Sequence, residues 1–341
     1  MEKNIEIEEL ISVIIPIHNY QIYFENSVKS ILQQTYKNLE IIIISDDTSG
    51  LVIKAISLLQ DKRLKLINGP KKGIAAALNK AIKYANGKYI ARMDADDFAL
   101  KNKFKSQLNF LLKNNLDVCG TNIKTIGLTD YNIKFPEVDK DIKYYALFGS
   151  PMAHPTVLGK ATIFKEFLYN ESISASEDYE LWIRMAKSGI KFGNIQESLL
   201  LYRIHTAQGS KTNIEKNNIS IIIAHDYASY YFNNDVDEIF IKTGFGFYPS
   251  YFYTDVSLLL ETILKYAQKS FIPTHIFEKT VISLYSKIID YSFIVLKGYY
   301  KFQRDNCLNI NFKFIFYLIF KCFYKNALPY KIITFLKKHY K

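Results

Sequence analysis

Short apolar runs recur in the first hundred residues, and stretches with helical spacing of apolar positions separate them. The runs are Ile11–Ile17, Leu39–Ile44, Leu64–Ile67 and Tyr89–Met93. Runs of this length that end in polar turns are typical of strands buried on both faces. The intervening segments with helical spacing are 20–35, 51–60 and 73–87. Strands alternating with helices predict an α/β fold with a doubly wound, mostly parallel sheet and right-handed crossovers.

The pattern continues to about residue 210 and then changes. Helices are expected at Phe98–Lys113, Asp139–Phe148 and Ser176–Ser188, and strands at Val118–Ile126 and from Leu199. From residue 211 onwards the chain has segments dense in Tyr, Phe, Ile and Lys, and no repeat is evident. Helices are expected there at Ile219–Phe232, Ser257–Ser270 and Phe277–Lys297. We therefore expect an α/β domain in residues 1–210 and a helical, aromatic- and lysine-rich region in residues 211–341.

Composition describes a folded, basic chain. Hydrophobic residues make up 49% of the 341 residues, and the net charge is +11, which favours an anionic partner such as a nucleotide, a polyanion or an acidic membrane surface. The three scattered cysteines suit reduced thiols in a cytoplasm. The polar N-terminus is unlike a signal peptide, and no uncharged stretch reaches the roughly 18–20 residues of a spanning helix. A soluble or peripheral protein is expected.

Three carboxylates follow the last of the four apolar runs. Asp94, Asp96 and Asp97 stand where a central strand ends, and open α/β sheets bind ligands outside the carboxyl ends of their strands. Clustered carboxylates raise one another's pKa unless a cation lies between them, and oxygen ligands suit Mg²⁺ or Mn²⁺. The alternative is that Asp96 or Asp97 caps a helix that begins near Phe98.

A second acidic pair, Asp46 and Asp47, ends the second strand, so it should face the same crevice. One carboxylate could bind a base or ribose of a nucleotide; the alternative is an ordinary turn or helix cap. Lys71 and Lys72 precede a helix N-terminus, which is a natural anion site, or they form a solvated basic turn. The chain has neither GxxxxGK[ST] nor GxGxxG, so P-loop and classical dinucleotide sites lack support.

Two later motifs carry further candidate chemistry. Asp178 follows Glu177 at a helix start, where acidic residues favour the helix dipole; alternatively Asp178 is a general base. The strand from Leu199 leads to a polar loop that could close over phosphates or supply a metal ligand, with Arg203, His205, Gln208 and Ser210. His154 precedes a proline, and a lone histidine is more often structural than catalytic.

The order of these motifs resembles that of the family 2 glycosyltransferases with the GT-A fold, over about residues 10–210. The motifs are IPIHN, ISDDTSG, KKGIAAALNKAI, YIARMDADD, SEDYELW and YRIHTAQGS. The resemblance implies a metal-dependent transfer of a sugar, hexosyl or N-acetylhexosaminyl, from a nucleotide-sugar to an acceptor hydroxyl with inversion. UDP is the commonest expectation for the nucleotide, and Mn²⁺ or Mg²⁺ for the metal.

The resemblance also implies roles for single residues. The donor pocket would be lined by Pro16, His18, Asn19, Asp46, Asp47, Lys71, Lys72 and Asp94. Within it, Asp47 would receive the base and Asp94 would face the ribose. Asp96 would hold the metal with the diphosphate, and His205 would close the site as a further metal ligand. Asp178 occupies the place of the family's catalytic base. The chain departs from the family pattern at two places. Thr48 replaces a common glycine and KKG replaces an arginine-containing loop, so the resemblance defines the donor preference less sharply than the activity.

The resemblance and the composition together set the expected partners. The acceptor would be a saccharide or a lipid-linked sugar in bacterial-type surface polysaccharide or glycolipid synthesis. The basic aromatic segment 312–341 favours an anionic membrane surface at the inner face of the cell membrane, or a packed subdomain or homo-oligomer contact. No nucleic acid partner is expected.

Two other functions stay open. A sugar nucleotidyltransferase would carry a glycine-rich basic loop after its first strand, where this chain has IPIHNYQ. A non-catalytic basic module that binds membrane or nucleic acid would explain the net charge but would not need acidic residues at two strand ends.

Overall fold

The computed structural model describes residues 9–147, 149–205 and 214–231 and five positions beyond them: Val295, Gly298, Tyr299, Phe302 and Gln303. The chain divides into two compact units, residues 1–146 with 150–219 and residues 147–149 with 220–341. The expected boundary at 210/211 falls outside the described residues and stays a prediction. The same holds for segments 232–294 and 304–341, which include the expected helix at Ser257–Ser270, most of that at Phe277–Lys297, and the basic segment 312–341.

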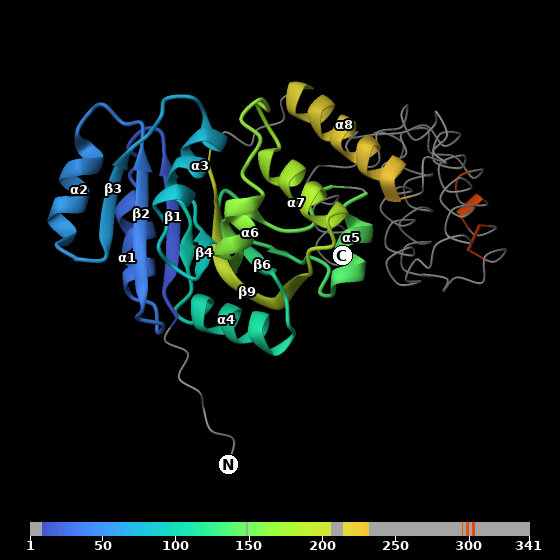
Figure 1. Ribbon diagram of the computed structural model, residues 1–341, viewed down its shortest axis with the longest axis horizontal. Helices are drawn as coiled ribbons and strands as arrows, with labels where there is room; N and C mark the ends of the chain where they lie inside the picture. The colour runs from blue at the N-terminus through green and yellow to red at the C-terminus, as the bar shows by residue number, and fades with distance from the viewer. Residues whose placement is uncertain are drawn as a thin grey trace, which may run out of the picture. The chain divides into compact units, whose positions relative to one another are not determined.

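Four parallel strands form the first half of the sheet, in the order β3-β2-β1-β4 (Figure 1). They are β1 (Ile11–Ile17), β2 (Leu39–Ser45), β3 (Leu64–Asn68) and β4 (Tyr89–Arg92). The connecting helices are α1 (Phe24–Leu32), α2 (Leu51–Leu59) and α3 (Ile74–Tyr84). The α/β pattern predicted from the apolar runs is confirmed.

Both faces of this half are covered, which explains why most positions of the strands are apolar. Val13 and Ile15 of β1 belong to a core cluster with Val28 and Ile31 of α1. Ile14, which points to the opposite face, lies with residues of α3. Successive side chains of a strand point to opposite faces, so each needs an apolar environment here.

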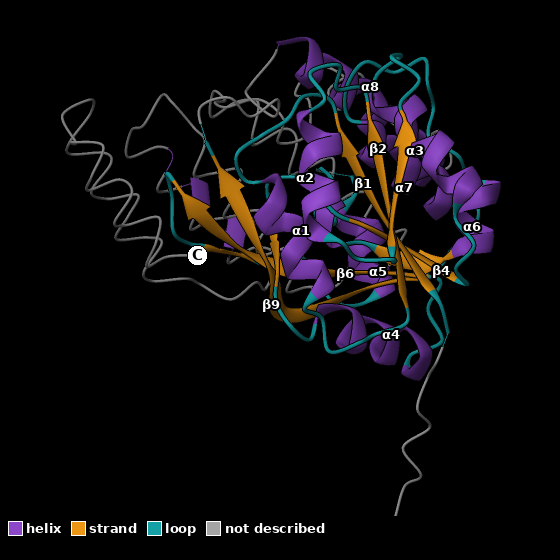
Figure 2. Ribbon diagram, turned by 90° about the vertical axis from the view of Figure 1, so that its left-hand side faces the viewer, coloured by secondary structure: helices purple, strands orange, loops and turns teal. Residues whose placement is uncertain are grey.

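The second half of the sheet is mixed. The order continues β8-β6-β9-β5, with β7 paired to β6. The strands are β5 (Phe98–Ala99), β6 (Val118–Gly127), β7 (Asn132–Ile133), β8 (Leu158–Lys160) and β9 (Phe192–Ile204). Strand β8 is antiparallel to β4 and β6, β5 is antiparallel to β9, and β6 and β9 are parallel. In Figure 2 the arrowheads of β1 and β2 point to the same edge.

The remaining helices follow β5 in the chain. They are α4 (Lys103–Lys113), α5 (Asp139–Tyr145), a 3₁₀ turn (His154–Thr156), α6 (Ala161–Glu166), α7 (Glu177–Lys187) and α8 (Ile214–Tyr231). Among the described helices, none combines the length and the hydropathy that crossing a membrane requires.

Two expected boundaries were wrong. The helix expected from Phe98 begins at Lys103, because Phe98 and Ala99 pair with β9 instead. Asp96 and Asp97 therefore do not cap that helix; its N-cap position is Asn102. Strand β9 begins at Phe192 rather than Leu199. Polar residues in the first part of β9 interrupt its apolar pattern, and the pairing of β9 with β6 shifts register near Asn122.

Candidate active site

The carboxyl ends of β1 to β4 form one edge of the parallel half-sheet. Strand β1 lies between β2 and β4, so the Asp46–Asp47 pair and the carboxylates after β4 are separated by one strand. Adjacent strands lie about 4.8 Å apart, which puts these two strand ends about 10 Å from each other. That spacing would allow one nucleotide to reach both acidic groups.

The carboxylates after β4 form a tight group. Asp94, Asp96 and Asp97 each offer an oxygen, and these oxygens lie within 4.8 Å of one another. Burial raises the pKa of Asp96, and the Asp94 charge adds to this effect. Burial and the Asp94 charge likewise raise the pKa of Asp97 well above its usual range. One oxygen of Asp97, Oδ2, is buried and has no hydrogen-bond partner among the described residues. The protein's own groups therefore compensate the charge of Asp96 and Asp97 only in part.

Two buried cationic side chains, which the sequence analysis missed, act on this cluster. Nη1 of Arg92 lies 2.5 Å from Oδ2 of Asp94. Burial alone would lower the pKa of Arg92, but the Asp94 charge raises it above its ordinary value. Lys103 is completely buried, and its Nζ donates a hydrogen bond to the carbonyl of Pro155 at 3.0 Å. Burial lowers the pKa of Lys103 to about 7, although the charge of Asp97 opposes this shift. In the sequence, the signal for these two residues was a charged side chain at a position expected to face a core.

The end of β9 supplies a second set of contacts. Nε2 of His205 lies 2.9 Å from Oδ2 of Asp96, and its role as a metal ligand that closes the site stays a prediction. The backbone N–H of Arg203 donates to Oδ1 of Asp97, and its Nε donates to the carbonyl of Asp96, at 2.8 and 2.9 Å. The Arg203 guanidinium stacks 4.0 Å from the ring centre of Tyr23. Gln208 and Ser210 lie outside the described residues.

Asp47, at the end of β2, makes the local contacts of an ordinary turn. Both of its carboxylate oxygens accept a hydrogen bond from Ser49 Oγ at 2.8 Å, and Oδ2 lies 3.5 Å from the backbone N–H of Val52. The Ser49 hydrogen bond lowers the pKa of Asp47, so the group is ionised at neutral pH. Asp47 thus anchors the start of α2, and its role toward a base stays a prediction.

The other predicted donor residues lie around the same strand ends. Asp46 accepts a hydrogen bond from the Lys71 backbone N–H, at 2.9 Å. The side chain of His18 is 81% exposed, with Nδ1 3.9 Å from Oδ2 of Asp46. The remaining predicted residues are the half-buried Pro16 and the exposed Asn19 and Lys72.

Asp178, the predicted base, lies half-buried in the first turn of α7. Burial raises the pKa of Tyr169, and the charges of Glu177 and Asp178 act in the same direction. That hydroxyl pairs with Nε2 of His154 at 2.7 Å. Burial lowers the pKa of His154 well below its ordinary value, which leaves a neutral ring in a structural role.

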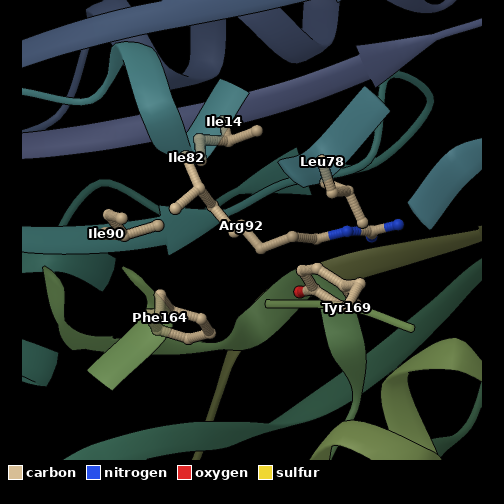
Figure 3. A pocket seen from close by; sticks show the side chains of 7 residues that line it. All are labelled: Ile14, Leu78, Ile82, Ile90, Arg92, Phe164 and Tyr169. Carbon is tan, nitrogen blue, oxygen red and sulfur yellow. The ribbon is translucent and has the colours of Figure 1, made fainter. Parts of the chain in front are cut away.

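A small cavity lies beside Arg92 and Tyr169. Arg92 and Tyr169 line it, and Ile14, Leu78, Ile82, Ile90 and Phe164 complete the wall (Figure 3). It has room for about one water molecule. In Figure 3 the Arg92 side chain runs between Leu78 and Tyr169. The charge of Asp94, and to a smaller extent that of Glu177, raises the pKa of this guanidinium.

Curated relatives of the chain are glycosyltransferases. An uncharacterized glycosyltransferase of Rickettsia conorii is 36% identical over 65% of this chain and 37% of its own length. The O-antigen biosynthesis glycosyltransferase WbnJ of Escherichia coli is 34% identical over 61% of this chain and 85% of that protein. WfgD of E. coli is a UDP-Glc:alpha-D-GlcNAc-diphosphoundecaprenol beta-1,3-glucosyltransferase. It is 33% identical over 52% of this chain and 70% of its own length. The chain spans about a third of the length of the Rickettsia relative.

Solved structures share the fold at low sequence identity. S. aureus TarS 1-349 in complex with UDP-GlcNAc has a TM-score of 0.56 and 15% identity, over 92% of this chain and 88% of that one. The mannosyltransferase PcManGT of Pyrobaculum calidifontis, in complex with GDP-Man and Mn2+, has a TM-score of 0.51 and 14% identity. The match covers 81% of this chain and 85% of that one.

These comparisons agree with the arrangement of the sheet. The family model for glycosyl transferase family 2 matches residues 12–171. The GT-A architecture expected from the motifs is confirmed by the mixed α/β sheet and by its likeness to TarS. The chain therefore belongs to glycosyl transferase family 2.

Proposed function

We propose that this protein is an inverting glycosyltransferase that moves a sugar from a UDP-sugar to an acceptor hydroxyl in surface polysaccharide or glycolipid synthesis. The observation that carries the proposal is the cluster of Asp94, Asp96 and Asp97 at a strand end one strand away from Asp46 and Asp47. The complex of TarS with UDP-GlcNAc and the relatives named for polysaccharide synthesis support it.

The residues present fit a hard divalent cation. The oxygens of the cluster are close together, the pKa of Asp96 and Asp97 is raised, and Oδ2 of Asp97 is buried without a hydrogen-bond partner among the described residues. Asp96 would hold Mn²⁺ or Mg²⁺, with His205 beside it. When bound, the cation neutralises charge that develops on the leaving nucleoside diphosphate.

The chain's own residues would orient the donor and accept one proton. Asp94 faces the ribose and Asp47 the base, while Lys71 and Lys72 provide positive charge beside the nucleotide. Asp178 takes the proton of the acceptor hydroxyl as that oxygen attacks the anomeric carbon from the face opposite the leaving group. Direct displacement requires no enzyme nucleophile, so a single base suffices.

The acceptor is a saccharide, and a lipid-linked one is favoured by the activity for which WfgD is named. Such an acceptor would place the protein at the inner face of the cell membrane. A flotation assay with anionic vesicles, in which the full chain is compared with a truncation near residue 300, tests membrane association through the basic segment 312–341.

A panel of nucleotide-sugars tests the function directly. The full chain would be screened by thermal shift with Mn²⁺ and then assayed for release of nucleoside diphosphate, with and without EDTA. We expect a UDP-sugar to stabilise the protein and to be turned over only with metal. Release of pyrophosphate from a nucleoside triphosphate and a sugar phosphate would instead identify a nucleotidyltransferase. A chain that neither binds nor turns over any nucleotide-sugar would refute the proposal.

A further inference from the structure

Asp46 lies near the carboxyl ends of three strands, β1, β2 and β3. It follows β2 directly, and its carboxylate lies toward the loop after β3, where Oδ1 accepts the Lys71 backbone N–H at 2.9 Å. Its other oxygen, Oδ2, lies 3.9 Å from Nδ1 of His18, which follows β1. The Asp46 side chain is only 10% exposed. Most of its surface is therefore turned toward the protein.

The loop after β3 is shaped around this carboxylate. A Cβ atom at Gly69 would lie 2.0 Å from Oδ1 of Asp46, so only glycine permits the observed approach. Two residues later, Lys71 has a φ of 55°, in the left-handed region that a non-glycine residue adopts only at a cost. The backbone N–H of Lys71 is the group that Asp46 binds, so the hydrogen bond stabilises this unfavourable conformation.

The two aspartates of the pair have different surroundings. Asp47 bonds to Ser49 in its own turn, whereas Asp46 bonds to a loop 25 residues further along the chain. The loop that Asp46 holds carries Lys71 and Lys72, both with exposed side chains, immediately before α3. Exposed lysines on an unrestrained loop would lose conformational entropy when they bind an anion.

We propose that Asp46 is a positioning residue, which fixes the Lys71–Lys72 loop so that its ammonium groups face the nucleoside diphosphate, and that it does not bind the donor itself. This inference rests on the proposed function. Loss of the hydrogen bond to the Lys71 N–H should weaken donor binding about tenfold, the equivalent of one ordinary hydrogen bond, although both lysines remain.

Three variants of the full chain separate positioning from direct contact. Asp46→Asn keeps an oxygen that can accept the Lys71 N–H, Asp46→Ala removes it, and Gly69→Ala leaves the carboxylate intact but excludes it from its place. Asp61→Asn is the matched control, because Asp61 precedes β3 at the opposite end of the same strand. Melting followed by Trp182 fluorescence establishes that each variant is folded.

The first readout does not depend on activity. Trypsin cleaves after lysine, so the rate of cleavage at Lys71 and Lys72, measured by mass spectrometry, reports how firmly the loop is held, with cleavage at Lys54 of α2 as the internal reference. We expect faster cleavage in Asp46→Ala and Gly69→Ala and near wild-type rates in Asp46→Asn and Asp61→Asn.

The second readout is calorimetry with UDP and Mn²⁺. We expect affinity to fall about tenfold in Asp46→Ala and Gly69→Ala and to change little in Asp46→Asn. The inference is overturned if Asp46→Asn binds UDP as weakly as Asp46→Ala while both keep the wild-type cleavage pattern, because Asp46 would then contact the nucleotide through its charge. Normal cleavage in Gly69→Ala would also overturn it. If the wild-type chain binds no UDP, the proposed function fails, and the cleavage rates still decide whether Asp46 holds the loop.

Discussion

Replacing Lys103 with methionine should stabilise the protein, although it removes a hydrogen bond. The Lys103 side chain is completely buried in α4, and among the described residues its Nζ donates a hydrogen bond only to the Pro155 carbonyl. Burial lowers its pKa to about 7, and the charge of Asp97 offsets only part of that effect. The folded state therefore holds a lysine that resists protonation.

The magnitude follows from linkage between protonation and folding. A lysine whose pKa falls from 10.5 to about 7 on folding costs the folded state about 4 kcal/mol at pH 7. Methionine removes that cost but leaves the Pro155 carbonyl without its donor, which costs about 1–3 kcal/mol. We expect Lys103→Met to raise the free energy of unfolding by about 1–3 kcal/mol at pH 7.

The same reasoning fixes the pH dependence. Between pH 7 and 10.5 the unfolded chain binds more protons at Lys103 than the folded chain does, so this group's cost to the folded state falls as pH rises. Below about pH 7 the cost is fully present. At pH 9 about 2 kcal/mol of it remains, and the stability of the variant and of the wild type should be similar.

Urea unfolding at pH 7 and pH 9 in EDTA measures both effects. The signal is the fluorescence of Trp182, the one tryptophan of the chain, which is buried in the same compact unit as Lys103. Lys105→Met, at an exposed position of the same helix, is the control and should change stability by less than about 0.5 kcal/mol. A Lys103→Met variant that is destabilised equally at both pH values would show that the buried amine carries no such cost.

The remaining predictions concern catalysis, the metal and acid stability. Asp178→Asn should retain UDP-sugar affinity but lose about 10²–10⁴-fold in kcat, and undiminished turnover would contradict its assignment as base. Asp96→Ala should abolish the Mn²⁺-dependent part of UDP binding, which calorimetry with and without Mn²⁺ measures; unchanged affinity in both conditions would count against a metal at Asp96. Burial would raise the pKa of Glu40, but hydrogen bonds led by that from Lys65 lower it to about 2. Its stabilising effect is therefore present above pH 4.5 and lost as pH falls toward 2, so Glu40→Gln should cost about 3 kcal/mol at pH 7 and progressively less in urea unfolding below pH 4.5.

The parallel half of the sheet could be predicted from the sequence because its signals are local. Strand β1 has the predicted bounds, Ile11–Ile17, since both faces are buried and every position except Ser12 is apolar. The carboxylates Asp94 and Asp96 could be placed at a ligand-binding edge for the same reason, because parallel strands bring their carboxyl ends to one side. Strand β5 was missed because two residues, Phe98 and Ala99, carry no periodicity, and pairing with β9 decides their conformation.

Only the tertiary structure decided which charges meet. The sequence shows Arg92 and Lys103 as charged residues at positions expected to face a core, but it does not show that they lie near the same carboxylates, since that depends on how β4 and α4 pack. The two aspartates after β2 look equivalent along the chain, yet Asp47 bonds to its own turn and Asp46 to Lys71. Short-range patterns determine where strands and helices form, because burial of a strand or helix face is read from a few neighbouring residues. Contacts between residues distant in the chain depend on the packed arrangement of those elements, and here they set the charge and geometry of the site.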